Sequence, residues 1–137
     1  MFRLEPDGTG FAVLHDFDYF TSGGYPYGGL TQGTDGVLYG TTAFGGVRDN
    51  GTVFKLNPDG TGFTVLHDFD YSTSGAYPQS VLTQGTDGAL YGTASFGGVG
   101  DGGTVFKLYP DGSGFTVLYS LNKLTTNEAL TCFTQAD

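Results

Sequence analysis

Short runs of alternating apolar and polar residues, each closed by a glycine-containing turn, recur along this chain. The run VFKLNPDGTGFTVLHDF at 53–69 has two such stretches around Asn57-Pro58-Asp59-Gly60. Proline fixes φ at the second turn position and glycine accepts a positive φ, so this segment predicts a tight β-hairpin. A second hairpin is predicted over 81–96, around Gly85-Thr86-Asp87-Gly88. No helical apolar period of 3.6 residues interrupts the pattern before residue 122.

The whole pattern repeats with a step of 52 residues, because residues 54–104 restate residues 2–52 and a third copy starts at Phe106. Each full unit holds two hairpins, and thus four short strands. In the best-defined sheet, the predicted strands are at 80–84, 89–95, 104–108 and 115–120. Both faces of these strands carry apolar side chains, so each sheet needs a neighbour on either side. Four-stranded sheets stacked around an axis, as in a β-propeller, meet this need. A solenoid usually has shorter coils, and a sandwich would not repeat so regularly.

We therefore predict an all-β fold of tandem 52-residue four-stranded repeats, β-propeller-like, with about two and a half blades. Residues 1–121 form the array, in units 1–52, 53–104 and a partial 105–121, and residues 122–137 form an irregular tail. Within that tail, 129–131 weakly echoes the strand start at 81–83, and a short terminal helix is the alternative. Propellers typically close with four or more blades. We expect either a fragment of a longer array or self-association that completes it.

Composition narrows the choice of partners. The 137 residues include 25 Gly, 12 Phe, 9 Tyr and no Trp, and the formal net charge is −9. This charge opposes binding of nucleic acid and of anionic membrane surfaces. No apolar run approaches the roughly 20 residues that cross a bilayer, and no signal peptide is recognisable. The single Cys132 forms no intrachain disulfide, and no Cys/His cluster suggests zinc.

The motifs GTVFKL, LTQGTDG and LYGT recur in order at matching spacing. Together they resemble the GloVer repeat, a tandem motif of bacterial proteins. The resemblance covers residues 1 to about 120. It implies propeller-like repeats and a parent protein at the cell surface or outside the cell, and it supplies no established reaction or catalytic residue. Two features depart from the family pattern. The chain shows neither signal peptide nor sorting tail, and the third copy degrades from Tyr119 onward.

The two ends of each predicted sheet differ in loop length. One end has only minimal TDG and PDG turns, whereas the other carries the segments at 15–28, 44–51, 67–80 and 96–103. Loops carry function more often than the strands that hold them, so we expect a ligand-binding face at the loop-rich end.

Aspartates dominate the polar residues of these loops, since His15, Asp16 and Asp18 recur as His67, Asp68 and Asp70. One interpretation is a Ca²⁺ site built from carboxylates and loop carbonyls; the alternative is that the aspartates cap loop amides. Alternation places His67 on one side and Asp68 and Asp70 on the other side or in the following turn, so the three need not converge. The candidate ligand-binding aspartates are Asp16, Asp18, Asp49, Asp68, Asp70 and Asp101.

Aromatic residues are the second candidate contact group. Exposed rings can stack on sugars, whereas the alternative is that they pack loops against neighbouring blades. The candidate aromatic face consists of Tyr19, Tyr25, Tyr71, Tyr77, Phe44 and Phe96.

No nucleophile motif such as GxSxG accompanies the histidines, and an enzyme rarely needs one base per blade, so we expect no catalytic residue. The preferred function is a non-enzymatic repeat module for binding or structure, in a bacterial surface or secreted protein, with a glycan or a protein as ligand. The alternative is part of a carbohydrate-active enzyme or lectin whose catalytic residues lie outside this chain.

Overall fold

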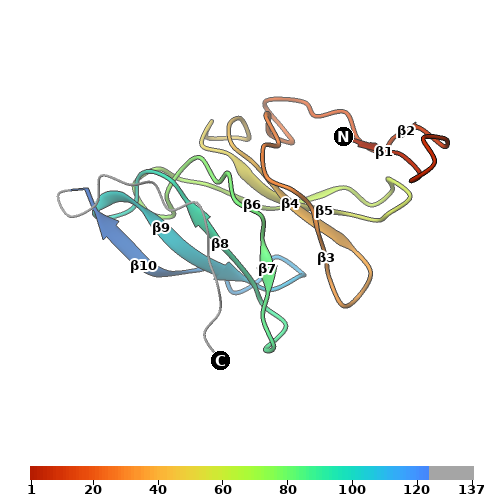
Figure 1. Cartoon of the computed structure of the whole chain (residues 1–137). Helices are drawn as coiled ribbons and strands as arrows, with labels where there is room; N and C mark the ends of the chain where they lie inside the picture. The colour runs from red at the N-terminus through yellow and green to blue at the C-terminus, as the bar shows by residue number, and fades with distance from the viewer. Residues whose placement is uncertain (124–137) are drawn as a thin grey trace.

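The computed structural model describes residues 1–123, and in this range the chain forms three antiparallel β-sheets without a helix (Figure 1). Membrane-spanning helices are accordingly not found in this part of the chain. The strands are β1 (Phe2–Arg3), β2 (Ala12–Val13), β3 (Thr31–Gln32), β4 (Leu38–Thr42), β5 (Thr52–Leu56), β6 (Thr64–Asp68), β7 (Thr83–Gln84), β8 (Leu90–Ala94), β9 (Asp101–Leu108) and β10 (Thr116–Asn122).

Strands that follow one another in the sequence lie side by side. β1 pairs with β2, and the two larger sheets have the orders β3-β4-β5-β6 and β7-β8-β9-β10. The register repeats too: Leu38 faces Leu56, and 52 residues later Leu90 faces Leu108. The predicted all-β architecture with four-stranded repeats is confirmed in the form of two four-stranded meanders and one two-stranded sheet.

The strand bounds differ by more than one residue from the predicted ones at three places. The strand predicted at 80–84 shortens to Thr83–Gln84, since the carbonyls of Ser80 and Leu82 accept hydrogen bonds from side chains of the preceding sheet. Strand β9 starts earlier, at Asp101, and β10 extends to Asn122, one residue past the expected end of the array. The strand or helix predicted within the tail lies outside the described residues.

Glycines inside strands β4 and β8 let aromatic rings approach the backbone. A Cβ added at Gly92 would lie 2.6 Å from Cζ of Phe106, and one at Gly40 would lie equally close to Phe54. Such a contact is too short for any side chain, so the Gly of the LYGT motif is required by the Phe of the next strand.

The buried core lies where one sheet meets the next. Phe69, which follows β6, packs edge-on against Phe106 of β9 with ring centres 5.1 Å apart, and both side chains are fully buried. Phe17 makes the same contact with Phe54 of β5 at 5.2 Å. One phenylalanine per repeat therefore joins consecutive sheets.

Replacing Phe106 by Ala should lower the free energy of unfolding by about 3–5 kcal/mol, because a fully buried ring is lost and a cavity remains. Urea unfolding of purified protein measures this change. Phe20→Ala is the matched control, since Phe20 is 75% exposed and should change stability little. Equal losses in the two variants would contradict the described core.

Candidate functional site at the loop-rich end

Each long loop that enters a sheet is bonded to the loop between the second and third strands of that sheet. The Gly98 amide donates to the Tyr71 carbonyl at 2.7 Å, and the Ala76 amide donates to the Phe96 carbonyl at 2.8 Å. The same two contacts occur 52 residues earlier, from Gly46 to Tyr19 and from Gly24 to Phe44. The four segments expected to form a contact face therefore meet in pairs.

A tyrosine–aspartate hydrogen bond fastens each pair of loops. The Tyr19 hydroxyl donates to Asp49 Oδ1, and the Tyr71 hydroxyl donates to Asp101 Oδ1, both at 2.5 Å. The carboxylate acceptor raises the pKa of Tyr19 to about 12 and also raises the pKa of Tyr71. Asp49 and Asp101 have positive φ angles of 59° and 56°, which are uncommon outside glycine. These two candidate aspartates thus hold the loops together.

Asp18 and Asp70 cap the turns that follow them. Asp70 Oδ1 accepts hydrogen bonds from the amide and hydroxyl of Ser72, at 3.0 and 2.6 Å, and from the amide and hydroxyl of Thr73, both at 3.2 Å. Asp18 Oδ1 accepts the equivalent bonds, including those from Thr21. The hydrogen bonds from Thr21 and from Ser72 are the main reason that the pKa values of Asp18 and Asp70 lie below the usual range. These contacts are the capping bonds expected in the alternative to a calcium site.

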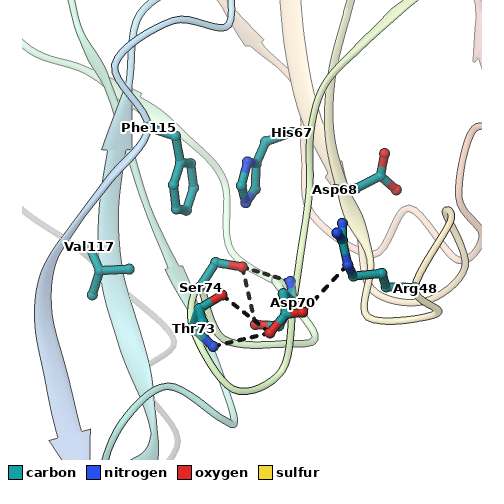
Figure 2. A pocket seen from close by; sticks show the side chains of 8 residues that line it. All are labelled: Arg48, His67, Asp68, Asp70, Thr73, Ser74, Phe115 and Val117. Atoms are coloured by element: carbon teal, nitrogen blue, oxygen red, sulfur yellow. Dashed lines mark hydrogen bonds and ion pairs between the residues drawn. The ribbon is translucent and has the colours of Figure 1, made fainter.

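A pocket of about 380 Å³ lies between the end of strand β6, the start of strand β10 and the neighbouring loops. Figure 2 shows His67 beside Phe115 and Asp68 beside Arg48, on different sides of the strand end, as alternation predicted. All three residues of the His67 set nevertheless line the pocket, because the strand ends at Asp68 and Asp70 belongs to the turn that follows. The lining residues are Arg48, His67, Asp68, Asp70, Thr73, Ser74, Phe115 and Val117.

Within this pocket His67 stacks on Phe115, with ring centres 3.5 Å apart and planes 4° from parallel. Its Nε2 is buried without a hydrogen-bond partner, and burial lowers the pKa of His67 to about 4. His15 makes the same stack on Phe63, and burial lowers its pKa as well. Both histidines are therefore neutral packing residues at pH 7.

Arg48 and Phe115 are site residues that sequence reasoning missed. Arg48 Nε lies 3.4 Å from Asp70 Oδ2, and the neighbouring Val47 amide donates to Asp68 Oδ1 at 2.9 Å. The signal for Phe115 was the equal spacing of His15 to Phe63 and His67 to Phe115. Arg48 interrupts the repeat, since Gly100 stands at that place in the next copy. Departures from a repeat are thus a useful signal for a local site.

The candidate aspartates do not gather around one point. Asp16 is exposed next to His15, Asp18 and Asp70 cap turns, and Asp49 and Asp101 bind tyrosines. Among residues 1–123, no group of three or more His, Cys, Asp or Glu side chains is placed to hold a metal ion.

Five of the six aromatic candidates, all except Tyr71, form a continuous row along the loop-rich end. Tyr25 contacts Phe44 at 5.5 Å between ring centres, Phe44 contacts Tyr77 at 4.9 Å, and Tyr77 contacts Phe96 at 5.8 Å. Tyr25 and Phe96, at the two ends, are 55% and 46% exposed. Tyr19 touches Tyr25 at 6.4 Å. The Phe44–Tyr77 contact joins loops of the two four-stranded sheets, so the row crosses from one repeat into the next.

Two members of this row have a strained backbone. Tyr25 and Tyr77 have positive φ angles of 56° and 58°, and each precedes a proline. Strained non-glycine residues persist only where surrounding contacts hold them, and they concentrate at functional sites. The same strain at the same place in both repeats marks this row as the best-defined candidate contact surface.

The family described as the Gloeobacter/Verrucomicrobia repeat has a model that matches residues 1–137. No curated protein matches the chain.

His67 should make the protein less stable in mild acid. Its pKa in the folded state lies below the usual value of 6.5, so the folded state favours the neutral ring. The resulting stability is fully present above about pH 6.5 and is lost as the pH falls towards about 4. In His67→Phe, the unfolding free energy should fall less over this range than in the parent protein. An NMR titration of His67 with a pKa near 6.5 would contradict the burial.

Calcium binding by the Asp70 loop stays a prediction, and an ion there would have to displace the hydroxyl donors of Ser72 and Thr73. If calcium binds, the melting temperature should be higher in CaCl₂ than in EDTA, and Asp70→Asn should abolish the difference. Equal melting temperatures in the two solutions would remove the calcium hypothesis.

Proposed function

The chain therefore belongs to the Gloeobacter/Verrucomicrobia repeat family, and on that basis we propose that it is a non-enzymatic binding module of a bacterial surface or secreted protein. The two four-stranded sheets act as blades of a larger β-propeller, and the loop-rich end is the contact face. The aromatic row Tyr25–Phe44–Tyr77–Phe96 is the observation that carries the binding proposal.

The row suits binding because its two end rings, Tyr25 and Phe96, are exposed and the half-buried rings between them are fixed in place. The tyrosine–aspartate bonds at Tyr19 and Tyr71 hold the loops on either side of it. A ligand that meets rings already held in position loses less free energy to ordering of the protein. The strain at Tyr25 and Tyr77 is consistent with a surface maintained for contact rather than for packing alone.

A neutral glycan is the ligand class that fits the row best. Sugar rings have apolar faces that pack on exposed aromatic rings, and their hydroxyls donate to carboxylates and carbonyls such as those of the adjoining loops. The net charge of −9 opposes polyanionic ligands. An uncharged oligosaccharide can pack on the aromatic rings and is not repelled by the negative charge of the protein.

The blade assignment has its own support. The two four-stranded meanders have the same order and register, and consecutive sheets meet through the same phenylalanine contact. A sheet with apolar residues on both faces needs a further sheet on each side, which a propeller supplies by radial repetition.

In a panel of neutral oligosaccharides, with cellohexaose and chitohexaose as defined probes, we expect the protein to bind through the aromatic row. For a probe that binds, Tyr25→Ala and Phe96→Ala should each weaken the affinity roughly tenfold, because each removes one stacking ring. Isothermal titration or NMR shift mapping measures the effect.

Tyr109→Ala is the matched control for this experiment. Tyr109 is 41% exposed and follows β9, in the turn at the opposite end of the sheet, so its loss should leave the affinity unchanged. If no oligosaccharide binds the parent protein, or if the three variants behave alike, the aromatic row is not a glycan-binding face.

A further inference from the structure

Consecutive sheets meet through one interface that the chain makes twice. His15 stacks on Phe63 with ring centres 3.6 Å apart, and His67 stacks on Phe115 at 3.5 Å. Beside each stack, a turn glycine of the later sheet lies against a leucine of the earlier sheet. A Cβ added at Gly60 would be 2.7 Å from the Leu14 carbonyl oxygen, and Gly112 lies in the same way against Leu66.

Every sheet therefore has two different sides. The leading side, which faces the preceding sheet, presents a glycine turn and a phenylalanine, as Gly60 and Phe63 do. The trailing side, which faces the next sheet, presents a leucine followed by an aromatic ring, as Leu66 and His67 do. A lysine adds a polar contact between them, since Lys55 Nζ donates to the Pro110 carbonyl at 3.2 Å.

The leading side of the β1–β2 sheet is open in the described structure. Phe2 and Phe11 are 63% and 64% exposed, whereas Phe54, which is equivalent to Phe2, is 1% exposed. A Cβ added at Gly8, the equivalent of Gly60, would meet no atom within 4 Å. The side chains are those of the internal interface, but no trailing side lies against them.

Among residues 1–123, the trailing side of the β7–β10 sheet is open as well. Leu118 stands in the place of Leu66 and is 44% exposed, and Tyr119 stands in the place of His67 and is 65% exposed. Tyr119 keeps a flat ring at this position, and such a ring can stack on phenylalanine as His67 does. Lys107 is the equivalent of Lys55, and Pro6 is the equivalent of Pro110. Each element of the internal interface thus has a matching partner at the opposite end of the chain.

We propose that the chain binds a second copy of itself head to tail, with the Leu118–Tyr119 side of one copy against the Gly8–Phe11 side of the next. The contact continues the interface that already joins the sheets within each copy. Because the two sides differ, the association is heterologous, and each added copy leaves one side open. The complex grows into a ring if the rotation closes and into an open chain if it does not.

Sedimentation equilibrium of the whole chain over a concentration series tests this proposal. The parent protein should form species whose mean mass rises with concentration beyond that of a dimer. Tyr119→Asp and Phe11→Asp each disable one side, so each variant alone should remain a monomer. An equimolar mixture of the two should form a one-to-one dimer and stop there, because each variant contributes the side that the other lacks.

Two control variants and a folding check accompany the measurement. Tyr119→His restores the residue of the internal stack and should preserve association. Val99→Asp changes a side chain that is 89% exposed between β8 and β9 and should also preserve it. Circular dichroism and thermal unfolding establish that the two interface variants are folded.

Three results would overturn the proposal. Sedimentation of the parent protein as a monomer at every concentration would leave the open sides to further repeats or another protein. Association of Tyr119→Asp alone or of Phe11→Asp alone would indicate a symmetric or unrelated contact. A mixture of the folded variants that stays monomeric would exclude the head-to-tail interface.

Discussion

Contact between consecutive sheets is the interaction on which the rest of this structure depends. Each four-stranded meander carries apolar side chains on both faces, so no sheet buries its residues alone. Phe17 and Phe69 meet this need by leaving the end of one sheet and packing on the central strands of the next. The glycines of the LYGT motifs are required in turn, because only glycine leaves room for the rings of Phe54 and Phe106, on which Phe17 and Phe69 pack. A step of 52 residues is thus the length of chain that builds one sheet and reaches the next.

The loop-rich end shows how short polar residues can fix long connections. Asp70 satisfies the amides and hydroxyls of its own turn, and Asp101 holds the Tyr71 hydroxyl of the adjoining loop. Backbone groups that leave a sheet need such partners, and local carboxylates provide them without a buried core. The aspartates are therefore largely occupied in positioning the loops, which leaves the aromatic rings as the groups best placed to meet a ligand.

The strands and turns could be predicted because their causes are local. Alternation and the PDG and TDG turns place β5, β6, β8 and β9 close to where the structure has them. The bulge that leaves Leu66 without a partner opposite β5 could not be predicted, since it depends on how strand β6 meets its neighbours. For the same reason the sequence named Phe44 and Tyr77 as candidates without indicating that they touch. Contacts between loops of different repeats depend on how the sheets are placed, and neither periodicity nor turn chemistry determines that placement.

Because Tyr119 replaces His67 at the corresponding position of the third repeat, acid should affect the interface within a copy and the proposed interface between copies differently. Burial keeps His67 neutral, so protonation acts against the stack that joins the two four-stranded sheets. Tyr119 has no imidazole nitrogen, so the proposed stack of Tyr119 on a second copy contains no buried base of this kind. Loss of structure within a copy and dissociation between copies should therefore have different pH dependences. The interface within a copy and the proposed interface between copies have the same geometry but respond differently to protons. That difference arises from one substitution, Tyr119 at the place of His67 in the third repeat.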